Sequence, residues 1–163
     1  MLSVLKIIHG TTVDGPGLRS SIYFAGCTHR CEGCHNPQSW DVAEGKPMGI
    51  DEIVEVLNYN RFNVTFTGGD PFFQAEEVAQ LAKSIKLRLR KNNIWCYTGY
   101  RWEQLVKEPR FQSLLQSVDV LVDSPFILAQ RDISLRFRGS GNQRIIDVQK
   151  SLATGTLCLM EEY

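Results

Sequence analysis

The fold of this chain is decided by residues 63–99, which read NVTFTGGDPFFQAEEVAQLAKSIKLRLRKNNIWCYTG. Residues 63–67 are rich in β-branched and aromatic side chains and end at two glycines, which is typical of a strand that enters a loop. Apolar side chains then recur at helical spacing between residues 74 and 91, so we expect an amphipathic helix there. Residues 93–97 are again apolar and predict the next strand.

The alternation of strand and helix extends on both sides of this stretch. Further predicted elements are a first strand at 20–24, a short helix at 51–57, helical pieces at 102–106 and 111–116 that are broken near Pro109, and a strand at 118–122. Such alternation predicts an α/β fold with a largely parallel sheet. Polar and glycine-rich segments follow the predicted strands, and parallel α/β folds place their sites at these strand ends.

Composition narrows the class of protein. The chain has 163 residues, of which 43% are apolar and 22% charged, so we expect one folded domain over residues 1–163 with no linker or repeat. Lys plus Arg (18) equals Asp plus Glu (18), so the excess positive charge that drives nucleic-acid binding is missing. We expect no membrane span and no export signal, and therefore a cytoplasmic protein.

Three of the five cysteines lie within eight residues, as Cys27, Cys31 and Cys34. An odd number of cysteines without an export signal argues against a disulfide framework, so the three clustered thiols are interpreted as metal ligands. Cys96 and Cys158 each stand alone among apolar neighbours, and we expect both to pack in the core.

The spacing leaves the metal open at this point. Zinc takes four ligands, and His29 or His35 is available as the fourth, although the chain has no second cysteine pair. A cluster of four irons normally takes four cysteines, so three would leave one iron open to bind a small molecule.

Gly68-Gly69-Asp70-Pro71 follows a predicted strand. One interpretation is an ordinary strand-to-helix turn, since Gly tolerates unusual dihedrals and Pro starts helices. The alternative is a ligand site, because two glycines let a ligand approach backbone carbonyls, which suit an ammonium group.

The cysteine spacing with a downstream Gly-Gly-Asp-Pro resembles the radical S-adenosylmethionine (SAM) enzymes. Within them, the chain resembles the glycyl-radical activating proteins of anaerobic ribonucleoside-triphosphate reductases. The segments that carry this resemblance are residues 14–17 (DGPG), 26–37 (GCTHRCEGCHNP), 67–71 (TGGDP), 95–100 (WCYTGY), 120–126 (VLVDSPF) and 138–143 (RGSGNQ).

The resemblance implies a partial, open (β/α) barrel, since a complete barrel needs about 250 residues. It also implies that Cys27, Cys31 and Cys34 hold a 4Fe–4S cluster whose fourth iron binds SAM. One electron from the cluster would break the sulfonium bond to the 5′ carbon, giving methionine and a 5′-deoxyadenosyl radical. That radical would take a hydrogen atom from a glycine of the reductase's large subunit and leave a glycyl radical.

Two groups of SAM contacts follow from the same resemblance. The SAM ammonium would be received by Gly68, Gly69 and Asp70, through backbone carbonyls and the Asp carboxylate. The adenine would run along Gly33, Cys34 and His35. A reductant such as flavodoxin would supply the electron.

Two alternatives remain beside this interpretation. One is a radical SAM enzyme with a small-molecule substrate, of the deazapurine synthase type. The other is a non-catalytic zinc-binding interaction module, in which the three cysteines and a histidine hold zinc.

Other motifs allow two interpretations each. Residues 14–17 form either a tight turn or a surface that faces a partner. Thr98 and Asp123 either line the SAM pocket or cap turns. Residues 138–143 form either a hairpin turn or a contact to the SAM carboxylate or a partner. If a cluster is bound, we expect His29 and His35 to be solvated loop residues.

Overall fold

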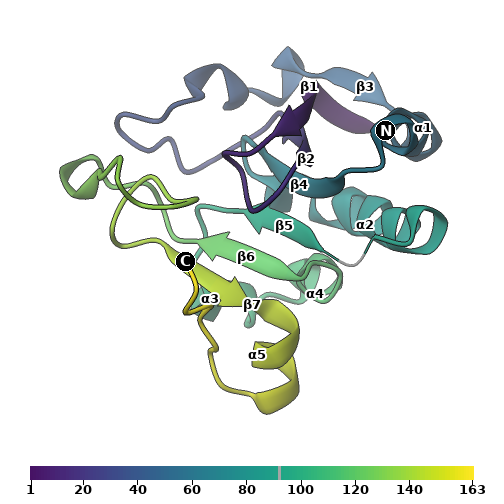
Figure 1. Ribbon diagram of the computed structural model, residues 1–163. Coiled ribbons are helices and arrows are strands. Elements are labelled where there is room, and N and C mark those ends of the chain that lie inside the picture. Colours follow the sequence, from purple (N-terminus) through teal and green to yellow (C-terminus); the bar gives the residue numbers. More distant parts are fainter. Residues whose placement is uncertain (92) are drawn as a thin grey trace.

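The computed structural model describes residues 1–91 and 93–163. In this part of the chain, seven strands form one open sheet, and helices connect its central strands (Figure 1). The strands are β1 (Leu2–Thr11), β2 (Arg19–Phe24), β3 (Lys46–Met48), β4 (Asn63–Gly68), β5 (Ile94–Tyr97), β6 (Val120–Asp123) and β7 (Arg144–Asp147). The α-helices are α1 (Ile50–Asn60), α2 (Ala75–Leu89), α3 (Trp102–Leu105), α4 (Pro109–Leu115) and α5 (Val148–Thr154).

The sheet has the strand order β3-β1-β2-β4-β5-β6-β7. The four strands β2, β4, β5 and β6 pair in parallel, whereas β1, β3 and β7 pair antiparallel. The expectation of a largely parallel sheet is therefore confirmed for the centre and wrong for both edges. For the β1–β2 pair the reason is local, because residues 12–18 are too few to cross back over the sheet, and antiparallel strands need only a short connection.

The predicted elements are found within a few residues of their expected bounds. The helix expected at 51–57 is the longer α1, and Pro109 is the first residue of α4, where its missing N–H costs nothing. The strand expected to be first, at 20–24, is the second, because β1 was not predicted. Burial alternates along β1 in the structure, whereas the adjacent apolar pairs Val4-Leu5 and Ile7-Ile8 interrupt the period-2 pattern in the sequence.

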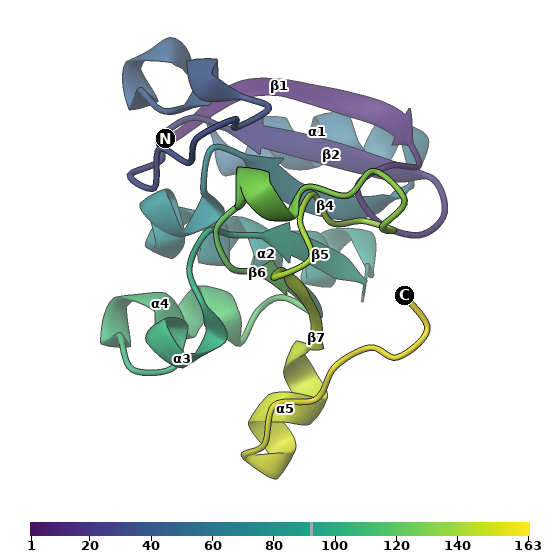
Figure 2. The ribbon, with the colours of Figure 1, turned by 90° about the vertical axis from the view of Figure 1, so that its left-hand side faces the viewer.

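Alternate residues along the central strands face opposite layers. Phe24, Phe66 and Cys96 point to the main core, which α1, α2 and α4 cover. Trp95 points to the other face, where it packs with Phe137 and Tyr163. Figure 2 shows α1 and α2 behind the strands and the loop that follows β6 in front of them.

The two isolated cysteines differ. Cys96 has no exposed surface, which confirms its predicted place in the core. The same expectation for Cys158 is wrong, since this residue is only half-buried and its thiol donates to the Thr156 carbonyl at 3.2 Å. The apolar neighbours of Cys158 lie in an irregular segment after α5 and give it no helix or strand face to pack from.

No helix among the described residues combines the length and the apolar character needed to cross a membrane.

Candidate cofactor site

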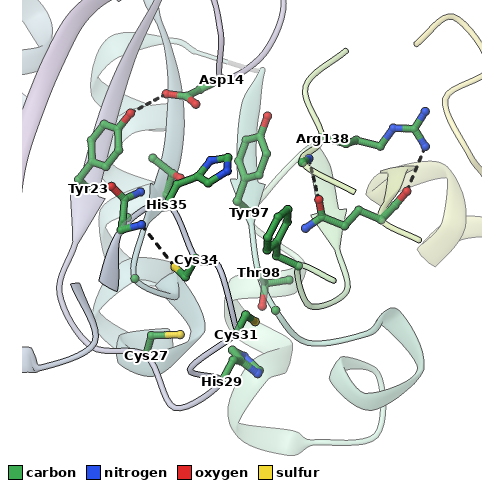
Figure 3. Close-up of a pocket in the computed structure, with 18 of the residues that line it drawn as sticks. Asp14, Tyr23, Cys27, His29, Cys31, Cys34, His35, Tyr97, Thr98 and Arg138 are labelled. Atoms are coloured by element: carbon green, nitrogen blue, oxygen red, sulfur yellow. Dashed lines mark hydrogen bonds between the residues drawn. The ribbon is translucent and has the colours of Figure 1, made fainter. Parts of the chain in front are cut away.

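A cavity of about 560 Å³ opens at the carboxyl ends of the parallel strands (Figure 3). The loops after β2, β4, β5 and β6 form its walls, as predicted for the polar segments at these strand ends. Its volume lies within the usual range for small-molecule and cofactor sites, about 300–1,000 Å³. The residues of the predicted motifs that line it include Cys27, Cys31, Cys34, His35, Gly68, Gly69 and Thr98.

The three clustered cysteines share this cavity. All three are half-buried free thiols, and the Cys34 sulfur accepts a hydrogen bond from the Asn36 N–H at 3.4 Å. Burial raises the pKa of the Cys27 thiol to about 11, and the charge of a bound metal would favour the thiolate. In the described part of the chain, no three potential ligand side chains already converge tightly enough to hold an ion. The soft donors fit an iron–sulfur group by chemistry and by their common cavity.

Gly68 and Gly69 allow two loops to approach each other closely. A Cβ on Gly69 would lie 2.5 Å from the Gly26 carbonyl oxygen, and one on Gly68 would lie 2.5 Å from the Phe24 nitrogen. The Gly69 N–H donates to the Phe24 carbonyl, and the Asp70 N–H donates to the Gly26 carbonyl, both at 2.8 Å. The glycines therefore join the loop after β4 to the start of the cysteine loop, and they also present their backbone to the cavity.

Asp70 is 2% exposed, and its carboxylate is occupied by donors from this chain. It accepts hydrogen bonds from His29 Nε2 (2.8 Å), Thr98 Oγ1 (2.9 Å), the Gly99 N–H (3.0 Å) and the Phe72 N–H (2.9 Å). The expectation of a solvated His29 is wrong, because the side chain is 17% exposed and its ring also stacks against a tyrosine. The sequence did not indicate this pairing, because His29 and Asp70 lie 41 positions apart.

Besides Cys34, the residues expected along the adenine are Gly33 and His35, and their environments differ. His35 is exposed, as expected, and its ring lies 5.4 Å from that of Phe126 at the cavity wall. Gly33 has a φ of +74°, and a Cβ there would lie 2.8 Å from Leu128 Cδ1. Gly33 therefore lets the loop after β6 pack against the cysteine loop.

Comparisons with known proteins show the family to which the chain is related. Residues 13–146 match the family model described as a 4Fe-4S single cluster domain. The chain is 35% identical over 154 residues to the anaerobic ribonucleoside-triphosphate reductase-activating protein of Haemophilus influenzae, covering 88% of this chain and 97% of that protein. The protein of the same name from Vibrio cholerae is 37% identical over 141 residues (82% and 90%), and that of Enterobacteria phage T4 is 31% identical over 141 (82% and 86%).

The chain belongs to the anaerobic ribonucleoside-triphosphate reductase-activating protein family. The resemblance drawn from its motifs is thereby confirmed. The matched region contains the cysteine loop and the loops after β4, β5 and β6.

Thr98 and Asp123, which the sequence left with two interpretations each, both form hydrogen bonds to other residues of the chain. Thr98 lines the cavity and donates to Asp70, and its Oγ1 accepts from the Tyr100 N–H at 3.1 Å, as in the predicted turn. Asp123 is fully buried and accepts from Arg144 Nη2 (2.6 Å) and the Trp102 N–H (2.8 Å). Its carboxylate caps the start of α3, which favours the cap over the pocket role.

Residues 138–143 form a loop whose polar groups bond to one another. Gln143 Oε1 accepts from the Gly139 N–H at 2.8 Å and the Ser140 N–H at 3.1 Å, and Arg138 donates to the Gln143 carbonyl at 3.1 Å. This loop forms one wall of the cavity (Figure 3).

Sequence reasoning missed the end of the cavity opposite the cysteines. There Tyr23 donates to Asp14 Oδ2 at 3.0 Å, and Tyr97 donates to the Phe137 carbonyl at 2.8 Å. Burial, with help from the Asp14 charge, raises the pKa of Tyr23 to about 12. Both tyrosines line the cavity because they lie on the sheet face opposite the helices, which strand periodicity could have indicated.

A buried arginine, Arg19, stabilises the turn at residues 14–17. Arg19 is 0% exposed and donates to Thr65 Oγ1 (2.7 Å) and the Pro16 carbonyl (3.2 Å). Burial lowers the pKa of Arg19 to about 10. The turn interpretation thus has direct support, and Asp14 reaches the cavity from it.

Proposed function

We propose that this chain activates an anaerobic ribonucleoside-triphosphate reductase by forming a glycyl radical on its large subunit. The observation that carries the proposal is the placement of three free thiols from one short loop on a cavity at the carboxyl edge of the sheet. Membership of the activating-protein family supplies the reaction class.

Cys27, Cys31 and Cys34 would hold a 4Fe–4S cluster in this cavity. When bound, the cluster supplies one electron that cleaves SAM into methionine and a 5′-deoxyadenosyl radical, which removes a hydrogen atom from the reductase glycine. Three protein ligands leave one iron free for the SAM amino and carboxylate groups. The chain's own part is to place the two cofactors and exclude competing reactions.

The SAM ammonium would meet the backbone of Gly68 and Gly69, which faces the cavity. The Asp70 carboxylate already accepts four hydrogen bonds from the protein. It would therefore attract the ammonium through its negative charge and hold the Gly68-Gly69 loop in place. His35 and Cys34 line the cavity where we place the adenine, with Gly33 keeping the loop compact.

The open sheet with helices on one face supports a partial barrel over residues 1–163, whose open side would admit a protein loop. The five free cysteines support a location in a reducing compartment, the cytoplasm. There a reductant such as flavodoxin would supply the electron. The zinc alternative is decided by metal analysis, because the bond from His29 Nε2 to Asp70 leaves Nδ1 available as a ligand.

The test is anaerobic reconstitution with iron and sulfide, followed by electron paramagnetic resonance with and without SAM. We expect a cluster signal that changes on adding SAM, 5′-deoxyadenosine release with dithionite, and a glycyl-radical signal on the reductase. One zinc and no iron per chain would overturn the proposal. Release of 5′-deoxyadenosine without a glycyl radical would instead favour a small-molecule substrate.

A further inference from the structure

His29 lies inside the cysteine loop, but its side chain is turned toward the neighbouring loops of the sheet. His29 Nε2 donates to Asp70 Oδ2 at 2.8 Å, and the same oxygen accepts from Thr98 Oγ1 and the Gly99 N–H. One carboxylate oxygen therefore connects the loops after β2, β4 and β5. A charge-assisted bond of this kind, with both partners largely buried, is among the stronger hydrogen bonds in proteins.

The imidazole ring is also held by packing. It stacks edge-on against Tyr100, with ring centroids 4.5 Å apart. Gly99 lies against another part of the ring, since a Cβ on Gly99 would come within 2.5 Å of His29 Cδ2. The ring thus has a fitted site, with Asp70 for its nitrogen and Gly99 and Tyr100 for its carbons. Figure 3 shows it beside Cys31, at the cysteine end of the cavity.

The backbone of the cysteine loop is bonded to another part of the chain at Cys27. The Cys27 N–H donates to the Trp40 carbonyl at 3.1 Å, and the Cys34 N–H donates within the loop to the Cys31 carbonyl at 3.1 Å. His29 is the middle residue of the Cys27-to-Cys31 span. Its bond to Asp70 ties that span to the rigid strand ends.

We propose that His29 is a positioning residue that fixes the Cys27-to-Cys31 span against the ends of β4 and β5 through Asp70. The role of these thiols as cluster ligands rests on the proposed function. The position of the Cys27-to-Cys31 span is independent of that function and can be measured in the metal-free chain.

Three substitutions separate the hydrogen bond from the bulk of the ring. His29→Ala removes both. His29→Gln keeps an N–H donor at a reach close to that of Nε2. The shorter side chain of His29→Asn cannot bring its N–H donor to Asp70. Gly99→Ala leaves His29 and Asp70 intact and displaces the ring by steric contact, so it tests the same site should His29→Ala fold poorly.

The readout is the rate of iodoacetamide alkylation of each cysteine in the anaerobic, metal-free chain, followed by peptide mass spectrometry. Cys27 is the reporter and Cys158 the internal reference, because both are half-buried and Cys158 lies far along the chain after α5. We expect His29→Ala, His29→Asn and Gly99→Ala to raise the Cys27 rate by roughly ten- to a hundredfold relative to Cys158. His29→Gln should restore most of the wild-type rate, and His29→Ala combined with Gly99→Ala should be non-additive.

An unchanged Cys27 rate in His29→Ala and Gly99→Ala would overturn the proposal. So would an equal rise at Cys158 in all variants, which would mean general loosening, or no difference between Gln and Ala at position 29. Iron and sulfide loading of the same variants then separates the two proposals. If even the wild-type chain takes up no iron, the proposed function fails while the alkylation result still decides the role of His29.

Discussion

Two loops that border the same cavity are built in opposite ways. In the polar loop, residues 138–143, side-chain and backbone groups satisfy one another, with Gln143 also donating to the Ser124 carbonyl and Asn142 to the Pro125 carbonyl. In the cysteine loop, residues 27–34, the thiols stay free and face the cavity. A self-satisfied loop forms a fixed wall, whereas a loop with free soft donors is completed by a ligand from outside.

The largest effect should come from removing a thiol of the cysteine loop. We expect Cys34→Ala to lower iron retention and reductase activation by more than about a hundredfold, since even loss of an outer-shell partner costs 10–100-fold. Iron analysis after anaerobic reconstitution measures it. Cys158→Ala is the matched control and should retain iron, because that thiol bonds to the Thr156 carbonyl outside the cavity. Equal iron in both variants would contradict the contrast between the loops.

The next effect concerns the junction that holds the cysteine loop to β4. Gly69→Ala would force a Cβ to within 2.5 Å of the Gly26 carbonyl oxygen, which backbone cannot easily avoid. We expect a loss of about 1–3 kcal/mol in the free energy of unfolding, measured by denaturant titration. Gly141→Ala in the polar loop is the control, because its Cβ has nothing nearer than 3.9 Å. A similar loss in both variants would show that the close approach is unimportant.

Within the polar loop, Gln143→Ala should cost stability and spare the cofactor. It leaves the Gly139 and Ser140 N–H groups and the Ser124 carbonyl without their partner, at about 1–3 kcal/mol in the free energy of unfolding. Iron content per folded chain should stay at the wild-type level. If Gln143→Ala lost as much iron as Cys34→Ala, the polar loop would also position the cluster.

The smallest effect lies where the polar loop runs into β7. Arg144 donates to Glu103, which lowers the pKa of Glu103 to about 2. A carboxylate with a lowered pKa stabilises the fold above its unfolded pKa of about 4.5, and that contribution is lost as the pH falls toward 2.

Because the Glu103 side chain is 52% exposed, we expect less than about 1 kcal/mol from this pair. Thermal unfolding of wild type and Glu103→Gln should differ at pH 6 and converge as the pH approaches 2. A difference that persists at the lowest pH would refute the ion-pair origin.

Local pattern was enough to predict most of the central fold. Residues 63–67 and the helical spacing up to residue 91 correspond to β4 and α2, because strand and helix periodicity reflect which side chains face the core. The antiparallel edges escaped prediction, since pairing direction depends on which strands meet. Asp123 was assigned correctly only as one of two alternatives, because its partner Arg144 lies 21 residues away.

The sequence by itself determined the family of the chain and the type of donor that its cysteine loop offers, since residue type and motif spacing are local properties. Only the tertiary structure decided how that loop is held. The bond between His29 and Asp70 spans 41 positions, and it exists because parallel strands bring their carboxyl ends to one edge of the sheet. Residue type is a local property, whereas a hydrogen bond across loops depends on where the whole fold places both partners.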